Sequence, residues 1–153
     1  MLIAGVRIVV TSAQLIDLQP ALVEFGYQLK FAGLKLDKKN FGIGAKSDPF
    51  FRVRSYSAQG GYAPTIYKSE VLYDTLNPNW APFVVYRSQF YKQNNPDPQL
   101  LIEVYDYDKK DGDVHVIGTV LIHWHEFKWL GSRWTLQDKD KKEYEKSLII
   151  LIY

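Results

Sequence analysis

The chain has 153 residues, of which 46% are hydrophobic and 15% aromatic; this composition excludes disorder and fits one globular domain over residues 1–153. A net charge of +2, with Lys and Arg spread along the chain, gives no ground for nucleic-acid binding and does not exclude an anionic membrane surface. The absence of cysteine excludes disulfides and thiolate metal sites and fits a reducing compartment. No apolar run approaches the ~18 residues that a membrane-spanning helix needs.

Alternation of apolar and polar residues predicts short strands along the whole chain. Turn-forming sequences rich in Gly, Pro, Asn and Asp separate these runs, so eight or so strands should form an antiparallel β-sandwich. The final run, SLIILIY, is apolar on both faces and should lie buried between layers or under another element. Short helices are expected over Leu15–Phe25, broken at Pro20, and over His125–Leu130. The predicted strands are Val6–Thr11, Tyr27–Phe31, Phe51–Arg54, Ile66–Tyr73, Pro82–Arg87, Gln99–Asp106, Val116–His123 and Ser147–Tyr153.

Four aspartates follow one another closely in the stretch VYDYDKKDGDVHVIG, beginning with Asp106 and Asp108. An EF-hand loop would need Gly at the sixth position, where Asp111 stands when the count begins at Asp106. Asp106 and Asp108 lie two apart at a strand end, so both carboxylates can face one ion, and Asp48 could join them from another turn. Calcium binding and a solvated acidic turn both fit this pattern.

Other chemistries find less support in the sequence. The segment FGIGAKS, residues 41–47, has Ala45 where a phosphate-binding loop needs Gly before the Lys. His123 and His125 could hold zinc from one face of a strand, with His115 as the third ligand, but partly buried histidines without a metal are the alternative. The chain has no G-x-S-x-G motif and no cysteine nucleophile, so neither an enzyme nor a small-molecule substrate is expected.

Three motifs in fixed order carry a family resemblance: SDPF at Ser47–Phe50, TLNPNW at Thr75–Trp80, and VYDYD with a later IG at Val104–Gly118. Their order and separation resemble a C2 domain. The longer stretches GLKLDKKN, YKSEVLYDTLNPNWAPF and DPQLLIEVYDYD are similar to the second C2 domain of copines, over about Gly5–Ile122. The resemblance implies an eight-stranded antiparallel Greek-key β-sandwich of C2 type. The von Willebrand-type domain of copines does not follow, so we expect either a fragment or a stand-alone relative.

The resemblance also implies a calcium site. C2 domains hold calcium with two aspartates from the first loop and three from the third, and Asp48, Asp106 and Asp108 match three of these positions. Asn40 replaces the other first-loop carboxylate, and His115 stands at the last third-loop position.

These two replacements weaken the expected site. Asp113 or Asp111 could take the place of the missing third-loop ligand, because this loop is one residue longer than in the family pattern. With Asn40 offering only a neutral oxygen, we expect calcium binding that is weakened or lost.

The same loops suit a membrane surface. Phe41 and Ile43 would place apolar side chains at a loop tip, unless they fold back to cap the sandwich. The lysines that could face an anionic leaflet around this tip are Lys38, Lys39, Lys109 and Lys110.

The sequence therefore predicts a calcium-dependent module that docks on anionic phospholipid, cytoplasmic and peripheral to the membrane. The alternative is a calcium-independent protein-interaction domain, acting as a subunit or scaffold in a larger assembly. The substitutions at Asn40 and His115 favour the alternative, whereas the aspartates retained at 48, 106 and 108 favour calcium.

Overall fold

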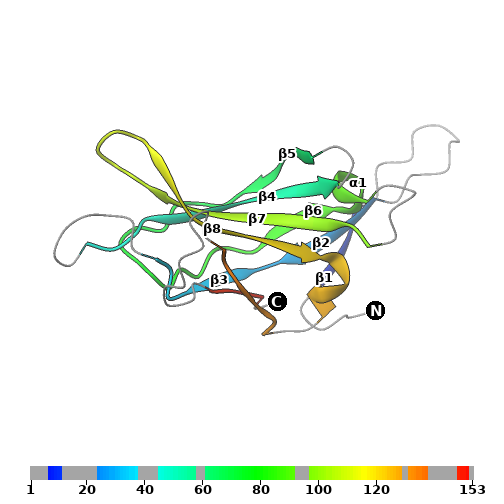
Figure 1. Ribbon diagram of the computed structural model, residues 1–153. Coiled ribbons are helices and arrows are strands. Elements are labelled where there is room, and N and C mark those ends of the chain that lie inside the picture. Colours follow the sequence, from blue (N-terminus) through cyan, green and yellow to red (C-terminus); the bar gives the residue numbers. More distant parts are fainter. Residues whose placement is uncertain are drawn as a thin grey trace, which may run out of the picture.

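The computed structural model describes residues 7–11, 24–37, 45–57, 61–91, 97–128, 131–137 and 148–151. Within these residues every strand pairing is antiparallel, as the alternating pattern predicted (Figure 1). The strands are β1 Arg7–Thr11, β2 Glu24–Leu29, β3 Phe31–Leu34, β4 Pro49–Ser57, β5 Gly61–Lys68, β6 Phe83–Tyr86, β7 Gln99–Tyr107, β8 Val114–His123, β9 Arg133–Thr135 and β10 Leu148–Leu151. Two short helices join them, α1 Arg87–Phe90 and the 3₁₀ turn η1 Trp124–Lys128.

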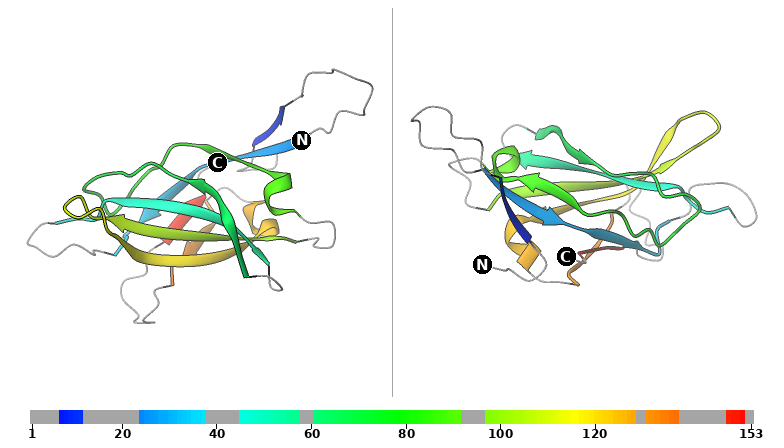
Figure 2. Two further views of the ribbon diagram at one scale, coloured as in Figure 1. Left: turned by 90° about the horizontal axis from the view of Figure 1, so that it is seen from above. Right: turned by 180° about the vertical axis from the view of Figure 1, so that it is seen from behind.

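The strands form two layers that face each other (Figures 1 and 2). One layer is a four-stranded sheet in the order β5-β4-β7-β8. The other contains two three-stranded sheets, β1-β2-β6 and β3-β10-β9, and only Lys30 separates β2 from β3 along the chain. The predicted antiparallel sandwich is confirmed, with ten strands in the described residues because β2 and β3 count separately and β9 was not expected.

Aromatic rings from both layers fill the space between the sheets. Phe31 of β3 lies with its ring centroid 5.5 Å from that of Phe51 on β4 and 5.5 Å from that of Phe83 on β6. All three side chains are almost completely buried, as is Ile149 of β10. Burying side chains of this size stabilises a domain by roughly 1.5–3 kcal/mol each. The predicted burial of the last strand is therefore confirmed at Ile149.

The TLNPNW segment fastens the first part of the chain to the sandwich. The Asn77 side chain accepts the backbone N–H of Lys35 at 2.9 Å, where Lys35 adopts a positive φ of 52°. The Pro78 carbonyl accepts the N–H of Gly33 at 2.8 Å. Trp80 is fully buried and donates its indole N–H to the Pro49 carbonyl at 3.3 Å. The motif thus fixes the start of β4, directly after Asp48.

Several predicted elements need correction. The strand expected over Ile66–Tyr73 is wrong in its second half, because β5 ends at Lys68. Beyond that point the N–H groups of Ser69 and Leu72 turn to the carbonyls of β4, at Phe51 and Pro49. The helix expected over Leu15–Phe25 is wrong at its end, where β2 begins at Glu24, and its earlier residues lie outside the described residues.

Of the two short helices, the sequence predicted η1 but not α1. The short helix expected over His125–Leu130 is confirmed as η1 over Trp124–Lys128. The helix α1 was not predicted, because four residues give no readable periodicity.

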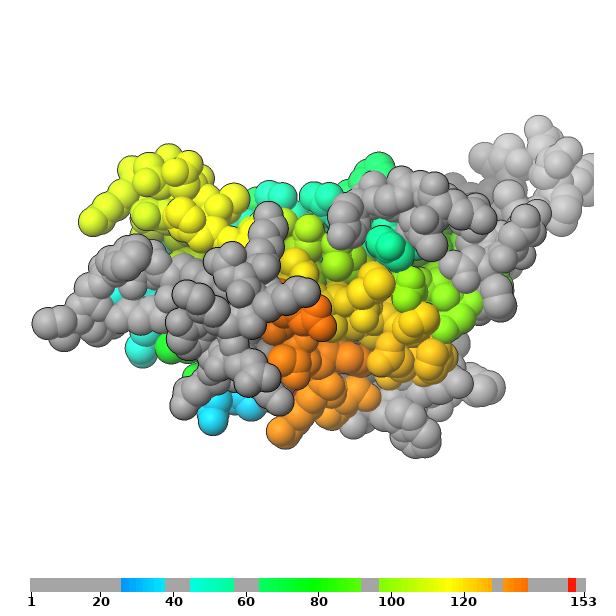
Figure 3. All heavy atoms as spheres, in the orientation of Figure 1, coloured from blue at the N-terminus to red at the C-terminus, as the bar shows by residue number. Residues whose placement is uncertain are grey.

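The β7–β8 turn and the 3₁₀ turn η1 lie at opposite ends of the sandwich. The β7–β8 turn projects from one end and stands out from the surface in yellow (Figure 3). At the other end η1 follows β8 directly (Figure 1). Antiparallel pairing of β7 with β8 enforces this separation, because Tyr107 pairs with Val114 at one end and Gln99 with His123 at the other.

Candidate functional site

Strand pairing brings Asp48 and Asp106 together. Asp48 directly precedes β4 and Asp106 lies near the end of β7, where it pairs with Pro49. Oδ1 of Asp106 accepts the backbone N–H of Asp48 at 2.6 Å. Asp106 is 0% exposed and Asp48 is 5% exposed. The first and third loops therefore meet at two buried carboxylates, as the C2 resemblance implied.

The second oxygen of Asp106 is buried without a hydrogen-bond partner among the described residues. Burial raises the pKa of Asp106 most, and the charge of Asp48 raises it further. The Asp48 N–H, the charge of His115 and a hydrogen bond from the Ser47 side chain act to lower it, and the overall shift is upward. An unsatisfied buried carboxylate oxygen costs about 1–3 kcal/mol, more when charged, unless a cation compensates it. The orphaned oxygen therefore fits a cation ligand.

Asp48 already has partners for both of its oxygens. Oδ1 accepts the N–H of Asp74 at 2.7 Å, and Asp74 has a positive φ of 58°. Oδ2 lies 3.4 Å from the Nζ atom of Lys109, and that ammonium group also lies 4.1 Å from the centre of the Tyr73 ring. A lysine from the third loop thus supplies positive charge beside the carboxylate pair.

The remaining third-loop aspartates help to shape the turn. Oδ1 of Asp108 accepts the N–H of Lys110 at 2.8 Å, and Oδ1 of Asp111 accepts the N–H of Asp113 at 3.0 Å. The Asp108 carbonyl accepts the N–H of Gly112, whose φ is +77°, at 3.0 Å. Side-chain oxygens of this kind favour tight turns. The acidic stretch therefore forms a well-defined turn next to the carboxylate pair.

The other expected site residues fall into three groups. Lys110 and Asp113 are exposed on the β7–β8 turn. His115 pairs with Asp106 across β7 and β8, and its charge acts to lower the pKa of Asp106. The loop residues Lys38, Lys39, Asn40, Phe41 and Ile43 lie outside the described residues.

Carboxylate oxygens are the ligand type that a hard cation takes, but Asp48, Asp106 and Asp108 do not bring three of them within 4.8 Å of one another. Calcium takes 6–8 oxygen ligands at about 2.3–2.6 Å, supplied by carboxylates, carbonyls and water. The carboxylates of Asp48 and Asp106 are adjacent, with Asp108 on the following turn. Calcium would require Lys109 to leave Asp48, which its long and 56% exposed side chain allows.

A second cluster lies at the opposite end. Among the described residues, the only His, Asp or Glu side chains that gather three together with ligand atoms within 4.8 Å are Asp97, His123 and His125. His115, the third ligand that the sequence left open, does not join this set, because β8 runs extended from Val114 to His123 and holds His115 at the far end. Sequence reasoning missed Asp97, whose one signal is its place two residues before a predicted strand.

The C2 domain family model matches residues 29–145. The chain belongs to the C2 domain family. Copine-B of Dictyostelium discoideum is 34% identical over 84 residues, which cover 54% of this chain and only 14% of that protein. The solved structure BON1-C2B matches with a TM-score of 0.63 and 23% identity, covering 82% of this chain and 87% of that one. A C2 domain of plant Extended Synaptotagmin 1 matches with a TM-score of 0.56 and 20% identity, covering 84% and 92%.

These findings confirm the C2-type sandwich and the resemblance to copines. C2 domains as a family are membrane- and calcium-binding modules, and they are typically regulatory rather than catalytic. No helix in the described part of this C2 domain has the length and apolar character to cross a membrane.

Proposed function

We propose that this C2 domain binds calcium between its first and third loops and thereby docks on anionic phospholipid. The supporting observation is Oδ2 of Asp106, which is buried without a hydrogen-bond partner among the described residues. The other oxygen of the same carboxylate is fixed by the Asp48 N–H, so the orphaned oxygen has a set direction. A divalent cation would compensate Asp106 and Asp48 together.

Asp48, Asp106 and Asp108 would be the central ligands, with Asp113 and Asn40 completing the protein's contribution. This set falls short of the 6–8 oxygens that calcium takes, so positions remain for water and lipid phosphate. Bound calcium would supply a positive centre that a phosphate oxygen can ligate. The protein acts in this proposal by binding, over residues 1–153 as one C2 unit, and not by catalysis.

Lysines and apolar side chains would add to the attachment. Lys109 would exchange Asp48 for a lipid phosphate when calcium enters, so one side chain would link the two events. Each lysine near an anionic leaflet contributes about 1 kcal/mol. The domain would thus lie peripherally on the cytoplasmic face of a membrane. The proposed contact residues are Lys38, Lys39, Lys109 and Lys110, with Phe41 and Ile43 at the loop tip.

Vesicle co-sedimentation tests the proposal. Wild-type protein should pellet with phosphatidylserine-containing vesicles in calcium, and remain in the supernatant in EGTA or with pure phosphatidylcholine. Asp106→Asn should lose the calcium-dependent fraction. Asp74→Asn is the matched control, because it removes the same charge from an exposed side chain whose backbone suits a positive φ. Equal pelleting in calcium and EGTA would contradict the proposal.

One observation favours the alternative, a calcium-independent protein-interaction domain that acts as a subunit or scaffold. Lys109 already places an ammonium group 3.4 Å from Oδ2 of Asp48, and so partly compensates the negative charge that a metal ion would otherwise compensate. If calorimetry detects no heat of binding up to millimolar calcium, and the protein does not bind vesicles, this alternative is favoured.

A further inference from the structure

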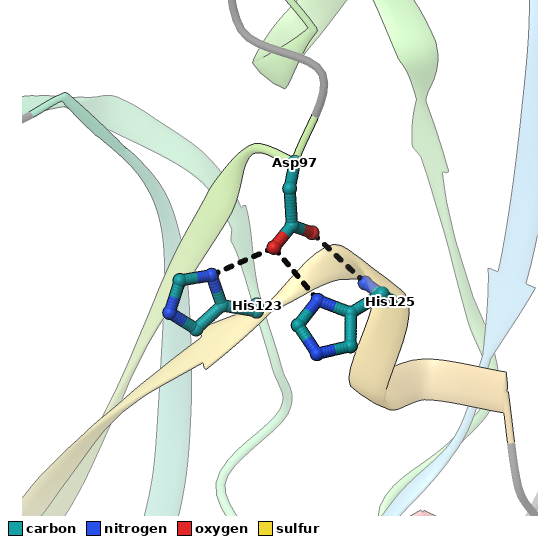
Figure 4. A group of neighbouring side chains, drawn as sticks. All are labelled: Asp97, His123 and His125. Atoms are coloured by element: carbon teal, nitrogen blue, oxygen red, sulfur yellow. Dashed lines mark hydrogen bonds and ion pairs between the residues drawn. The ribbon is translucent and has the colours of Figure 1, made fainter.

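We propose that Asp97, His123 and His125 form a binding site for a divalent transition metal of the zinc class, separate from the calcium loops. Oδ2 of Asp97 lies 2.9 Å from Nδ1 of His123 and 2.7 Å from Nδ1 of His125 (Figure 4). Two imidazole nitrogens and a carboxylate oxygen are the donors that zinc prefers at three-ligand sites. Calcium prefers oxygen, so the two ends of the sandwich would select different ions.

The backbone holds the three residues in place. Asp97 comes just before β7, His123 ends β8, and His125 lies in η1. Gln99 pairs with His123 across the sheet, and the Pro98 carbonyl accepts the N–H of Trp124 at 2.8 Å. The approach of Asp97 to the two histidines is therefore built into the register of β7 and β8.

Trp124, the residue between the two histidines, anchors the pair. Its ring centroid lies 4.7 Å from that of Tyr27 and 4.6 Å from that of Phe90. With Trp124 packed inward, His123 and His125 both turn toward Asp97, as Figure 4 shows. This arrangement explains how an H-x-H pair can converge although it spans a strand end and a 3₁₀ turn.

Further hydrogen bonds orient the ligands. Oδ1 of Asp97 accepts the N–H of His125 at 3.1 Å, so Oδ2 remains directed at the two rings. The Glu126 side chain accepts the N–H of His123 at 2.7 Å. The amide nitrogen of Gln99 lies 2.8 Å from Nε2 of His123, and turning the amide over would let its oxygen accept the Nε2 proton when Nδ1 binds a metal. Partners of this kind orient histidine ligands and are worth about 10–100-fold in metal affinity.

The distances are close to those that a metal requires. Metal–ligand bonds of about 2.0–2.1 Å in tetrahedral geometry would separate ligand atoms by roughly 3.3 Å. The two Nδ1–Oδ2 distances would therefore need to open by a few tenths of an ångström. The side chains are 35%, 45% and 58% exposed, for Asp97, His123 and His125, which permits this adjustment and the entry of an ion. The fourth position would face solvent.

Calorimetry with zinc chloride alone tests this proposal, using EGTA-treated, tag-free protein without vesicles. Wild-type protein should bind one zinc per chain with saturation. His125→Ala should weaken binding about tenfold or more, since it removes one of three ligands. His115→Ala is the matched control and should leave the affinity unchanged, because His115 lies at the other end of β8. Far-UV circular dichroism checks that both variants fold.

Cobalt(II) gives a second readout. The wild-type complex should show the visible absorption of a four-coordinate site, and His125→Ala should lose it. Non-saturable zinc binding, or equal losses in His125→Ala and His115→Ala, would overturn the proposal and leave a hydrogen-bonded cluster. Asp106→Asn should bind zinc like the wild type, so the outcome does not depend on the calcium site.

Discussion

The backbone N–H of Asp48 donates a 2.6 Å hydrogen bond to Oδ1 of Asp106, joining two loops that are 58 residues apart in the chain. This bond fixes one oxygen of Asp106 and leaves the other buried without a hydrogen-bond partner among the described residues. This buried oxygen therefore costs stability in the metal-free protein, and a bound cation of the kind proposed above would compensate it. Stability and ion binding should respond in opposite directions when this charge is removed.

Asp106→Asn should stabilise the metal-free domain and abolish its stabilisation by calcium. An amide loses less hydration free energy on burial than a carboxylate, and it keeps an oxygen for the Asp48 N–H. We expect a gain of about 1 kcal/mol, equivalent to about 2–4 °C in Tm for a domain of this size. Thermal unfolding in EGTA and in calcium measures both effects. A lower Tm in EGTA than that of wild type would contradict this prediction.

The pH dependence of the free energy of unfolding should reflect the titration of Asp106. The folded-state pKa of Asp106 is raised, so the native protein holds more protons than the unfolded chain between the ordinary value of 3.8 and the raised one. Stability therefore falls as pH rises through this window and stays lower above it. Relative to wild type, Asp106→Asn should gain stability as pH rises above about 4 in EGTA. Urea titrations across pH 4–7 measure the difference, and a constant difference would exclude Asp106 as its source.

Lys109→Met should tighten calcium binding in solution. The Lys109 ammonium lies 3.4 Å from Oδ2 of Asp48 and competes with an ion for that oxygen. An exposed ion pair contributes about 0.2–1 kcal/mol, so we expect up to about fivefold higher affinity. Lys110→Met removes the same charge from the next residue and should change the affinity less. Calorimetry without lipid separates this competition from membrane attachment. Equal changes in calcium affinity for Lys109→Met and Lys110→Met would instead indicate a general electrostatic effect of the loop's positive charge.

Much of the end that carries Asp48 and Asp106 could be predicted from the sequence, because short local patterns specify it. Period-two alternation identified β4 and β7, and the resemblance to C2 domains placed Asp48 and Asp106 at one end. The turn role of Asp108 was also open to sequence reasoning, as an alternative to ion binding. The contact of Lys109 with Asp48 was not, since a lysine stem can take many directions.

Other features needed the tertiary structure. Strand β9, Arg133–Thr135, has three residues and therefore too few to show a period. Asp97 meets His123 only because Gln99 pairs with His123, and such a register between strands is not contained in either strand alone. The histidine pair was visible in the sequence, but its third member was sought along the same strand rather than across the sheet.

Gly118, the glycine of the IG motif, should be required for the packing of the segment that follows η1. A Cβ atom at this position would lie 2.8 Å from Cβ of Leu136 and 3.3 Å from the Gln137 carbonyl oxygen. The neighbouring Thr119 exchanges two backbone hydrogen bonds with Gln137, of 3.0 and 2.8 Å, so the segment cannot retreat without losing them. Gly118→Ala should therefore destabilise the domain by about 1–3 kcal/mol.

Gly112→Ala provides the comparison for Gly118→Ala. No atom lies within 4 Å of a Cβ at Gly112, but its φ of +77° should cost about 1–2 kcal/mol through the backbone alone. The two variants are distinguished by adding Leu136→Gly, which removes the clashing Cβ. Because Leu136→Gly also removes a buried side chain, the loss in its combination with Gly118→Ala should be smaller than the sum of the two single losses, whereas with Gly112→Ala the two losses should add. Urea unfolding midpoints measure both, and additive losses in each pair would show that close approach to Leu136 is not what requires glycine at position 118.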